Sequence, residues 1–172
     1  MRKCFCNISA LELYRASGRL APDILHKPRT AKLNDCSVPP RPMLEDDLKR
    51  YGIKTHPCHV LCETKTGHAP RFVARHTHRH PLPARSLIVL NKDTLVVTPE
   101  LLFLELAASR DIDDIELLRI GFELCGTYVL DVSEDSWDGY TGTDAPITSA
   151  KKISTFLERC SGMNGSKRAR RL

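Results

Sequence analysis

Residues 95–107 read Leu95-Val-Val-Thr98-Pro99-Glu100-Leu-Leu-Phe-Leu-Glu-Leu-Ala107, and this stretch decides the fold class. Its first four residues, Leu95 to Thr98, are apolar or β-branched, which is typical of a strand. Thr98 suits the N-cap of a helix, and Pro99 suits the first helical position, where its missing N–H costs nothing. The residues that follow are apolar around nearly the whole helix, which predicts burial. A strand therefore leads directly into a buried helix.

Upstream and downstream of this stretch the sequence predicts further strands. Two of them, His59–Glu63 and Arg71–His76, flank a predicted turn at residues 65–68, and we expect the chain to turn back there as a hairpin. A third strand covers Ser86–Leu90, and a short one covers residues 128–132.

Helices are predicted at residues 7–18, 43–51, 113–125 and 149–160, besides the one that begins at Pro99. The first has a capping box formed by Ser9 and Glu12. The predicted class is α+β, with a small mixed or antiparallel sheet of about four or five strands and four or five helices. The sheet takes its strands from residues 58–98 and 128–132.

By pattern the chain divides into three parts. Residues 1–54 form an N-terminal helical segment, residues 55–162 an α+β domain, and residues 163–172 a basic tail. Ser166 in that tail predicts the start of one more short helix.

The net charge of +5 over 172 residues hides a strong asymmetry. Residues 1–54 carry 11 basic and 6 acidic side chains, and residues 55–90 carry 5 and 1. Residues 91–150 carry 3 basic and 13 acidic side chains, and residues 151–172 carry 7 and 1. This asymmetry fits a surface that faces a polyanion, and it equally fits basic and acidic halves that pack together.

The expected cellular location rests on two kinds of segment that the sequence lacks. The chain has no apolar run as long as a membrane span and no apolar segment at its start that would form a signal peptide. We therefore expect a cytoplasmic protein without a membrane partner. Its seven cysteines, an odd number, are expected to be reduced thiols there.

The histidine-rich segment at residues 71–80 is a candidate metal site. If the segment is extended, His76, His78 and His80 share one face, and three imidazoles suit zinc or nickel. Cys58 and Cys62 add thiolates nearby. In the alternative interpretation the strand leaves the sheet near His76, the later histidines are solvated, and both cysteines face the core. We expect no bound cofactor, with zinc as the exception.

No catalytic residue is assigned, because the sequence lacks nucleophile-elbow, phosphate-loop and dinucleotide-binding motifs. The candidate DNA contacts are basic. Arg71, Arg75 and Arg79 alternate on the face opposite the histidines, with Arg85 close by. The tail adds Lys167, Arg168, Arg170 and Arg171. For both groups a solvated surface is the competing interpretation.

The pattern His76-x4-Pro81-x-Pro83, an apolar strand, and then residues 95–107 resembles the AbiEi-like antitoxin family of bacterial abortive-infection systems. Ser9-Ala10-Leu11 and residues 121–128 resemble an actinobacterial branch in which this region precedes a very-short-patch-repair-like endonuclease domain. The resemblance implies a DNA-binding winged helix at the N-terminus, which would be degenerate here. It also implies a chain truncated before the nuclease, so that no catalytic residue is carried over.

Three functions remain open. The leading hypothesis is a non-catalytic, DNA-associated, antitoxin-like defence module. The second is a protein-interaction module that neutralises a cognate toxin or nuclease, and the third is a metal-dependent protein built on the histidines and cysteines.

Overall fold

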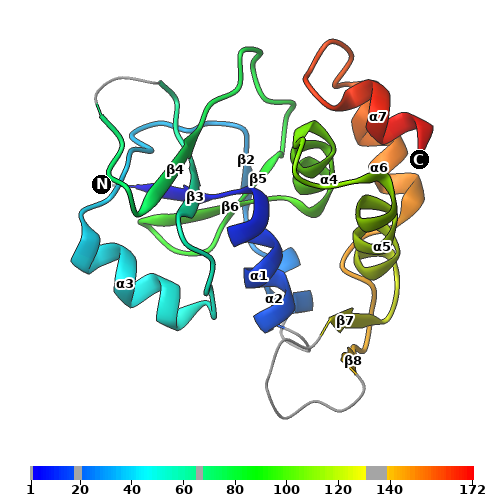
Figure 1. Ribbon diagram of the computed structural model, residues 1–172, viewed down its shortest axis with the longest axis horizontal. Coiled ribbons are helices and arrows are strands. Elements are labelled where there is room, and N and C mark those ends of the chain that lie inside the picture. The colour runs from blue at the N-terminus through cyan, green and yellow to red at the C-terminus, as the bar shows by residue number, and fades with distance from the viewer. Residues whose placement is uncertain (1, 18–20, 65–67, 131–138) are drawn as a thin grey trace.

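The computed structural model describes residues 2–17, 21–64, 68–130 and 139–172. A mixed sheet occupies the left half of the view in Figure 1, and the two-stranded sheet and the helices of the C-terminal part lie on the right. The large sheet contains β1 (Lys3–Phe5), β2 (Arg29–Thr30), β3 (Cys58–Leu61), β4 (Val73–His76), β5 (Leu87–Val89) and β6 (Thr94–Val97). The small sheet pairs β7 (Tyr128–Leu130) with β8 (Tyr140–Gly142) in antiparallel register. The α+β class and the mixed sheet are confirmed, with more strands than predicted.

The helices are α1 (Asn7–Ser17), α2 (Ala21–Leu25), α3 (Arg41–Arg50), α4 (Pro99–Ala108), α5 (Asp114–Cys125), α6 (Ala150–Glu158) and α7 (Ser166–Arg171). As predicted, Thr98 caps α4 and Asp113 caps α5, each accepting a backbone N–H of the first turn. Helix α4 is buried from Pro99 to Ala107 and packs against α1, α5, α6 and α7. It therefore forms the core of the helical half of the molecule.

The large sheet has the order β2-β5-β6-β1-β3-β4, so β1 lies inside it. Strand β1 pairs in parallel with β6 and antiparallel with β3. The sequence predicted helices and a Pro-containing loop but no strand in residues 1–54, whereas β1 and β2 both belong to the sheet. The three residues of β1 are too few to give a local pattern, and partners more than 50 residues away hold them in place.

The predicted hairpin between β3 and β4 was also wrong. The two strands pair in parallel, with Cys58 opposite Val73 and Leu61 opposite His76. Parallel pairing requires the chain to return to the starting end of β3 before β4 begins. The segment between the two strands is long enough for that return, whereas a two-residue hairpin turn is not. The turn predicted at residues 65–68 and the last two residues of the strand predicted at 128–132 fall mainly outside the described residues.

The capping box predicted for Ser9 and Glu12 at the start of α1 is not formed. The helix begins at Asn7, directly after β1, so Ser9 lies inside it. The Ser9 Oγ accepts the backbone N–H of His59, and Glu12 accepts the backbone N–H groups of Lys54 and Thr55. Both side chains thus fasten α1 to the segment around β3 instead of closing its own first turn.

In the described ranges, no helix combines the length and the apolar character that crossing a membrane requires.

Candidate functional site

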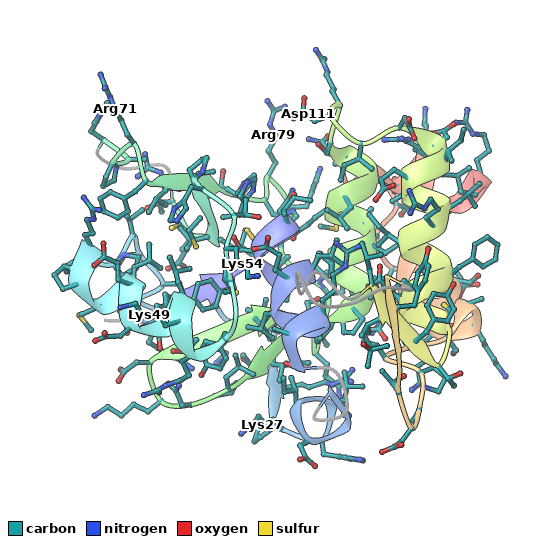
Figure 2. All side chains as sticks on the ribbon, turned by 60° about the horizontal axis from the view of Figure 1, so that its bottom comes forward. Lys27, Lys49, Lys54, Arg71, Arg79 and Asp111 are labelled. Atoms are coloured by element: carbon teal, nitrogen blue, oxygen red, sulfur yellow. The ribbon has the colours of Figure 1, made fainter. Side chains whose placement is uncertain are left out.

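The arginines predicted to share one strand face do not do so. Strand β4 begins at Val73 and ends at His76, so only Arg75 lies on it and is half-buried. Arg71 lies in the turn before β4 and Arg79 after its end, and both side chains extend into solvent (Figure 2). A turn closed by the Val73 N–H and the Pro70 carbonyl delays the start of the strand. These exposed arginines are therefore separate points on one edge of the molecule.

The basic residues of the C-terminal segment are largely engaged within the fold. Residues 166–171 form α7, and Arg168 donates to Asp114 at 2.7 Å and to the carbonyls of Ser109 and Ile112 at 3.0 and 2.6 Å. Arg171 also contacts Asp114. The hydrogen bond from Arg168, with the charge of Arg171, holds the pKa of Asp114 below its ordinary value.

Arg170 donates to the carbonyl of Leu157 at 2.6 Å, whereas Lys167 is exposed. Two of the four cations predicted as phosphate contacts in this segment are thus ion-paired with one carboxylate on α5, and a third is hydrogen-bonded to α6.

The three histidines of residues 71–80 are not brought together on one face. Strand β4 ends at His76, whose Nε2 lies 2.9 Å from Nδ1 of His59, with the two rings stacked. His78 Nε2 lies 2.9 Å from the buried Glu105, while His80 is exposed. Burial and the neighbouring His76 lower the pKa of His59, which favours the neutral imidazole of that residue.

The two cysteines predicted to join these histidines lie in the core. Cys58 and Cys62 are 0% and 3% exposed. Burial raises the pKa of the Cys58 thiol to about 11 and raises that of Cys62. All seven cysteines are free thiols. Nowhere in the described part of the chain do three His, Cys, Asp or Glu side chains gather in a group able to hold a metal ion.

A groove of about 350 Å³ brings five cations together on the surface. It lies between the β2 edge of the large sheet, the loop before β5, the start of α4 and helix α6. We call it the basic groove. Its cations are Arg29, Arg85, Lys151, Lys152 and Arg159, and no ion pair involves any of them within the described residues.

Three of these cations occupy positions that are locally unfavourable. Lys151 and Lys152 stand in the first turn of α6, where the helix dipole disfavours positive charge by roughly 0.3–1 kcal/mol each. Arg85 adopts a left-handed backbone, with φ of 66°, which is uncommon for a residue with a side chain. Such conflicts between local preference and structure gather at functional sites. Here they all place positive charge around one groove.

One carboxylate and one aromatic ring also line the basic groove. Glu100 is 6% exposed and accepts a hydrogen bond from the Thr148 hydroxyl, so it lies beneath the cations. The guanidinium of Arg159 lies 5.4 Å from the centre of the Phe156 ring. This cation–π contact positions the guanidinium of Arg159 without neutralising its charge. The groove remains strongly positive.

Of the groove cations, only Arg85 was among the predicted DNA contacts. The sequence did contain one usable signal, because Lys152 and Arg159 are seven residues apart and share the polar face of the predicted helix 149–160. Arg29 gave no signal within its Pro-containing loop. Its position opposite α6 depends on β2 pairing with β5 at the sheet edge.

The fold and the groove define an α+β domain with a basic surface groove. Comparison of the chain with models of protein families, with curated proteins and with solved structures gives no match.

Proposed function

We propose that this protein is a non-catalytic module that binds the phosphate backbone of DNA through the basic groove. The observation that carries the proposal is the gathering of five cations without ion pairs around one concave surface. The ion pairs among the described residues, such as that of Arg15 with Glu123, involve none of these five cations. Uncompensated cations at such a surface attract a polyanion and release its counterions on binding.

The spread of the cations favours a polymer of phosphates over a single small anion. Arg29 and Arg85 lie on the sheet side of the groove, and Lys151, Lys152 and Arg159 lie along α6. A nucleic acid backbone carries a charge every ~3.4 Å along each strand, so several phosphates can meet cations on both walls. The resemblance of residues 76–107 to AbiEi-like antitoxins supports the same class of function.

The groove presents charged and hydroxyl groups and no array of exposed aromatic side chains for stacking on bases. Contacts of this kind position a protein on the duplex and carry little sequence information. We therefore propose backbone binding with weak sequence preference. Any target preference would come from a partner or from the shape of the DNA.

The test is fluorescence anisotropy of a labelled duplex with the wild type and two double variants of equal charge. Lys151→Glu with Lys152→Glu reverses two groove cations, and acidic residues suit the first turn of a helix, so α6 is preserved. Arg71→Glu with Arg79→Glu makes the same change in net charge away from the groove.

We expect the first pair to weaken binding by at least about tenfold and the second by much less. Equal losses from both pairs would show that only the overall charge matters. Absence of wild-type binding at about 50 mM salt would refute the proposal.

A further inference from the structure

The edge strand β2 extends the positive surface beyond the basic groove. Arg29 of β2 lines the groove, and Lys27 and Lys32 lie on either side of it along the chain. Both lysines are exposed, and the ion pairs found where the structure describes the chain include neither of them. No Asp or Glu occurs between Asp23 and Asp35. We call Lys27, Arg29 and Lys32 the edge row.

The pairing of β2 fixes where the edge row lies. Strand β2 is the outermost strand on its side of the large sheet, and its Arg29 is opposite Ile88 of β5. The Lys27 ammonium donates to the carbonyl of Leu90 at 3.2 Å, which holds this lysine at the end of β5 that lies away from Arg85. The edge row therefore lengthens the positive surface along the edge of the sheet.

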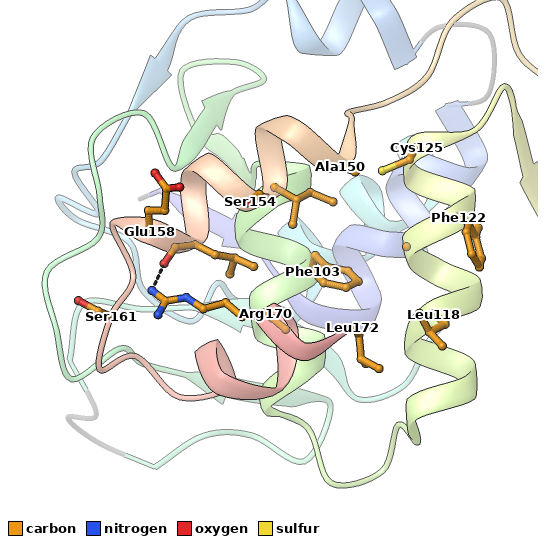
Figure 3. Close-up of a pocket in the computed structure, with 14 residues that line it drawn as sticks. Phe103, Leu118, Phe122, Cys125, Ala150, Ser154, Glu158, Ser161, Arg170 and Leu172 are labelled. Atoms are coloured by element: carbon orange, nitrogen blue, oxygen red, sulfur yellow. Dashed lines mark hydrogen bonds between the residues drawn. The ribbon is translucent and has the colours of Figure 1, made fainter.

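The surface on the opposite face of α6 has a different character. A cavity of about 890 Å³ there is lined mainly by apolar side chains, among them Phe103, Leu118 and Phe122 (Figure 3). Helix α5, which forms its far wall, carries the acidic residues Asp114 and Glu116 in its first turn. Neither surface attracts phosphates. A polyanion in the basic groove therefore meets further cations over β2 and not over α5.

We infer that a DNA duplex bound in the basic groove continues along the edge row, with Lys27 and Lys32 on phosphates beyond the groove. The inference rests on the proposed function and adds the path and the length of the duplex. An extended chain advances about 3.3 Å per residue, so residues 27–32 span at most about 16 Å. That is the axial length of about five base pairs. The ligand is therefore a duplex of several base pairs, and a mononucleotide or a phosphate ion would fill only part of the site.

Lysine and proline on an edge strand also have a second role, because they prevent pairing with the sheet edge of another molecule. Pro28, between Lys27 and Arg29, lacks the N–H that such pairing uses. A glutamate in place of a lysine keeps the edge charged and protected, but it repels a phosphate. Charge reversal in the edge row thus separates contact with DNA from protection of the edge.

The first test is the affinity for a labelled duplex of about 20 base pairs at about 100 mM salt. Lys27→Glu with Lys32→Glu should weaken binding at least about fivefold. The matched control, Arg71→Glu with Arg79→Glu, lies on the opposite side of the molecule and should weaken it less than about twofold (Figure 2). Lys27→Gln with Lys32→Gln should fall between the two. Unfolding midpoints establish that all variants remain folded.

The groove variant Lys151→Glu with Lys152→Glu separates this inference from the proposed function. If the groove variant loses affinity and the edge-row variant behaves like the control, the edge row does not contact DNA. The inference is then overturned, while the basic groove remains the binding site. If the wild type does not bind, or if only the edge-row variant loses affinity, the proposed function itself is overturned.

A second test varies the length of the duplex. A hairpin stem of about 4 base pairs covers the basic groove without reaching both lysines of the edge row, whereas a stem of about 12 base pairs covers both. The wild type should bind the longer stem at least about tenfold more tightly. Lys27→Glu with Lys32→Glu should reduce that ratio, because the larger number of positions on the longer stem favours both proteins equally. The same ratio for both proteins would overturn the inference.

Discussion

Arg168→Ala is expected to destabilise the fold while leaving DNA binding in place. The Arg168 side chain is 23% exposed, and its guanidinium donates to the carbonyls of Ser109, just after α4, and Ile112, just before α5. A hydrogen bond from a charged group contributes about 1.5–3 kcal/mol, and partial exposure reduces the loss because water replaces part of it. We therefore expect the free energy of unfolding to fall by about 2–4 kcal/mol, and the melting temperature by roughly 5–15 °C.

The matched control is Lys167→Ala, which removes a neighbouring cation that is exposed on the same helix. Urea titrations followed by circular dichroism give the free energy of unfolding for both variants and the wild type. The control should lie within about 0.5 kcal/mol of the wild type. If Arg168→Ala is as stable as the control and loses DNA affinity instead, the arginine is a phosphate contact and our account of α7 is wrong.

Three further predictions concern stability, each measured by urea unfolding. Gly165 and Gly162 both have a left-handed backbone, but a Cβ at 165 would lie 2.6 Å from a carbonyl oxygen of α4, whereas a Cβ at 162 meets nothing within 4 Å. Gly165→Ala should therefore cost at least about 2 kcal/mol more than Gly162→Ala, and equal costs would contradict the packing of α7 on α4. The buried ion pair of Lys3 with Asp47 predicts a loss of about 3–5 kcal/mol for Asp47→Ala, largely recovered when Lys3→Met is added; a loss below about 1 kcal/mol would show that the pair is solvated. The pKa of His59 is lowered in the fold, so the unfolded chain takes up its proton first as the pH falls, and stability present above the ordinary pKa is lost below it. His59→Gln should reduce the loss of stability between about pH 7.5 and 5.5, and an unchanged loss would assign it to other groups.

The elements that the sequence predicted well have strong local signals. Thr98 and Asp113 cap α4 and α5 as expected, because an N-cap acts within its own first turn. The full burial of α4 was also predicted, since residues apolar on all sides cannot face water at low cost. Such features depend on neighbours within about four residues.

The elements that it missed depend on distant partners. Strand β1 has three residues and includes a lysine, yet it is buried because β3 and β6 flank it and Asp47 neutralises Lys3. The parallel pairing of β3 with β4 has no local signature that separates it from a hairpin. Pairing partners are a property of the whole sheet, and no local pattern within one strand identifies them.

The basic groove was only partly predictable for the same reason. Lys151 and Lys152 are visible as helix residues, but their approach to Arg85 requires the packing of α6 beside the loop that precedes β5. Conversely, the basic residues of 167–171 were conspicuous in the sequence, although Asp114 and backbone carbonyls engage most of them. The density of basic residues in a sequence does not show whether their side chains are engaged by carboxylates and carbonyls in the fold.

The slope of log affinity for duplex DNA against log salt concentration tests the central claim most directly. If all five groove cations contact phosphates, the slope for the wild type is about −4 to −5, equivalent to a several-hundred-fold loss of affinity between about 50 and 200 mM salt. For the protein with Lys151→Glu and Lys152→Glu the slope should become shallower by about 2. A wild-type slope shallower than about −2, or the same slope for both proteins, would contradict the account.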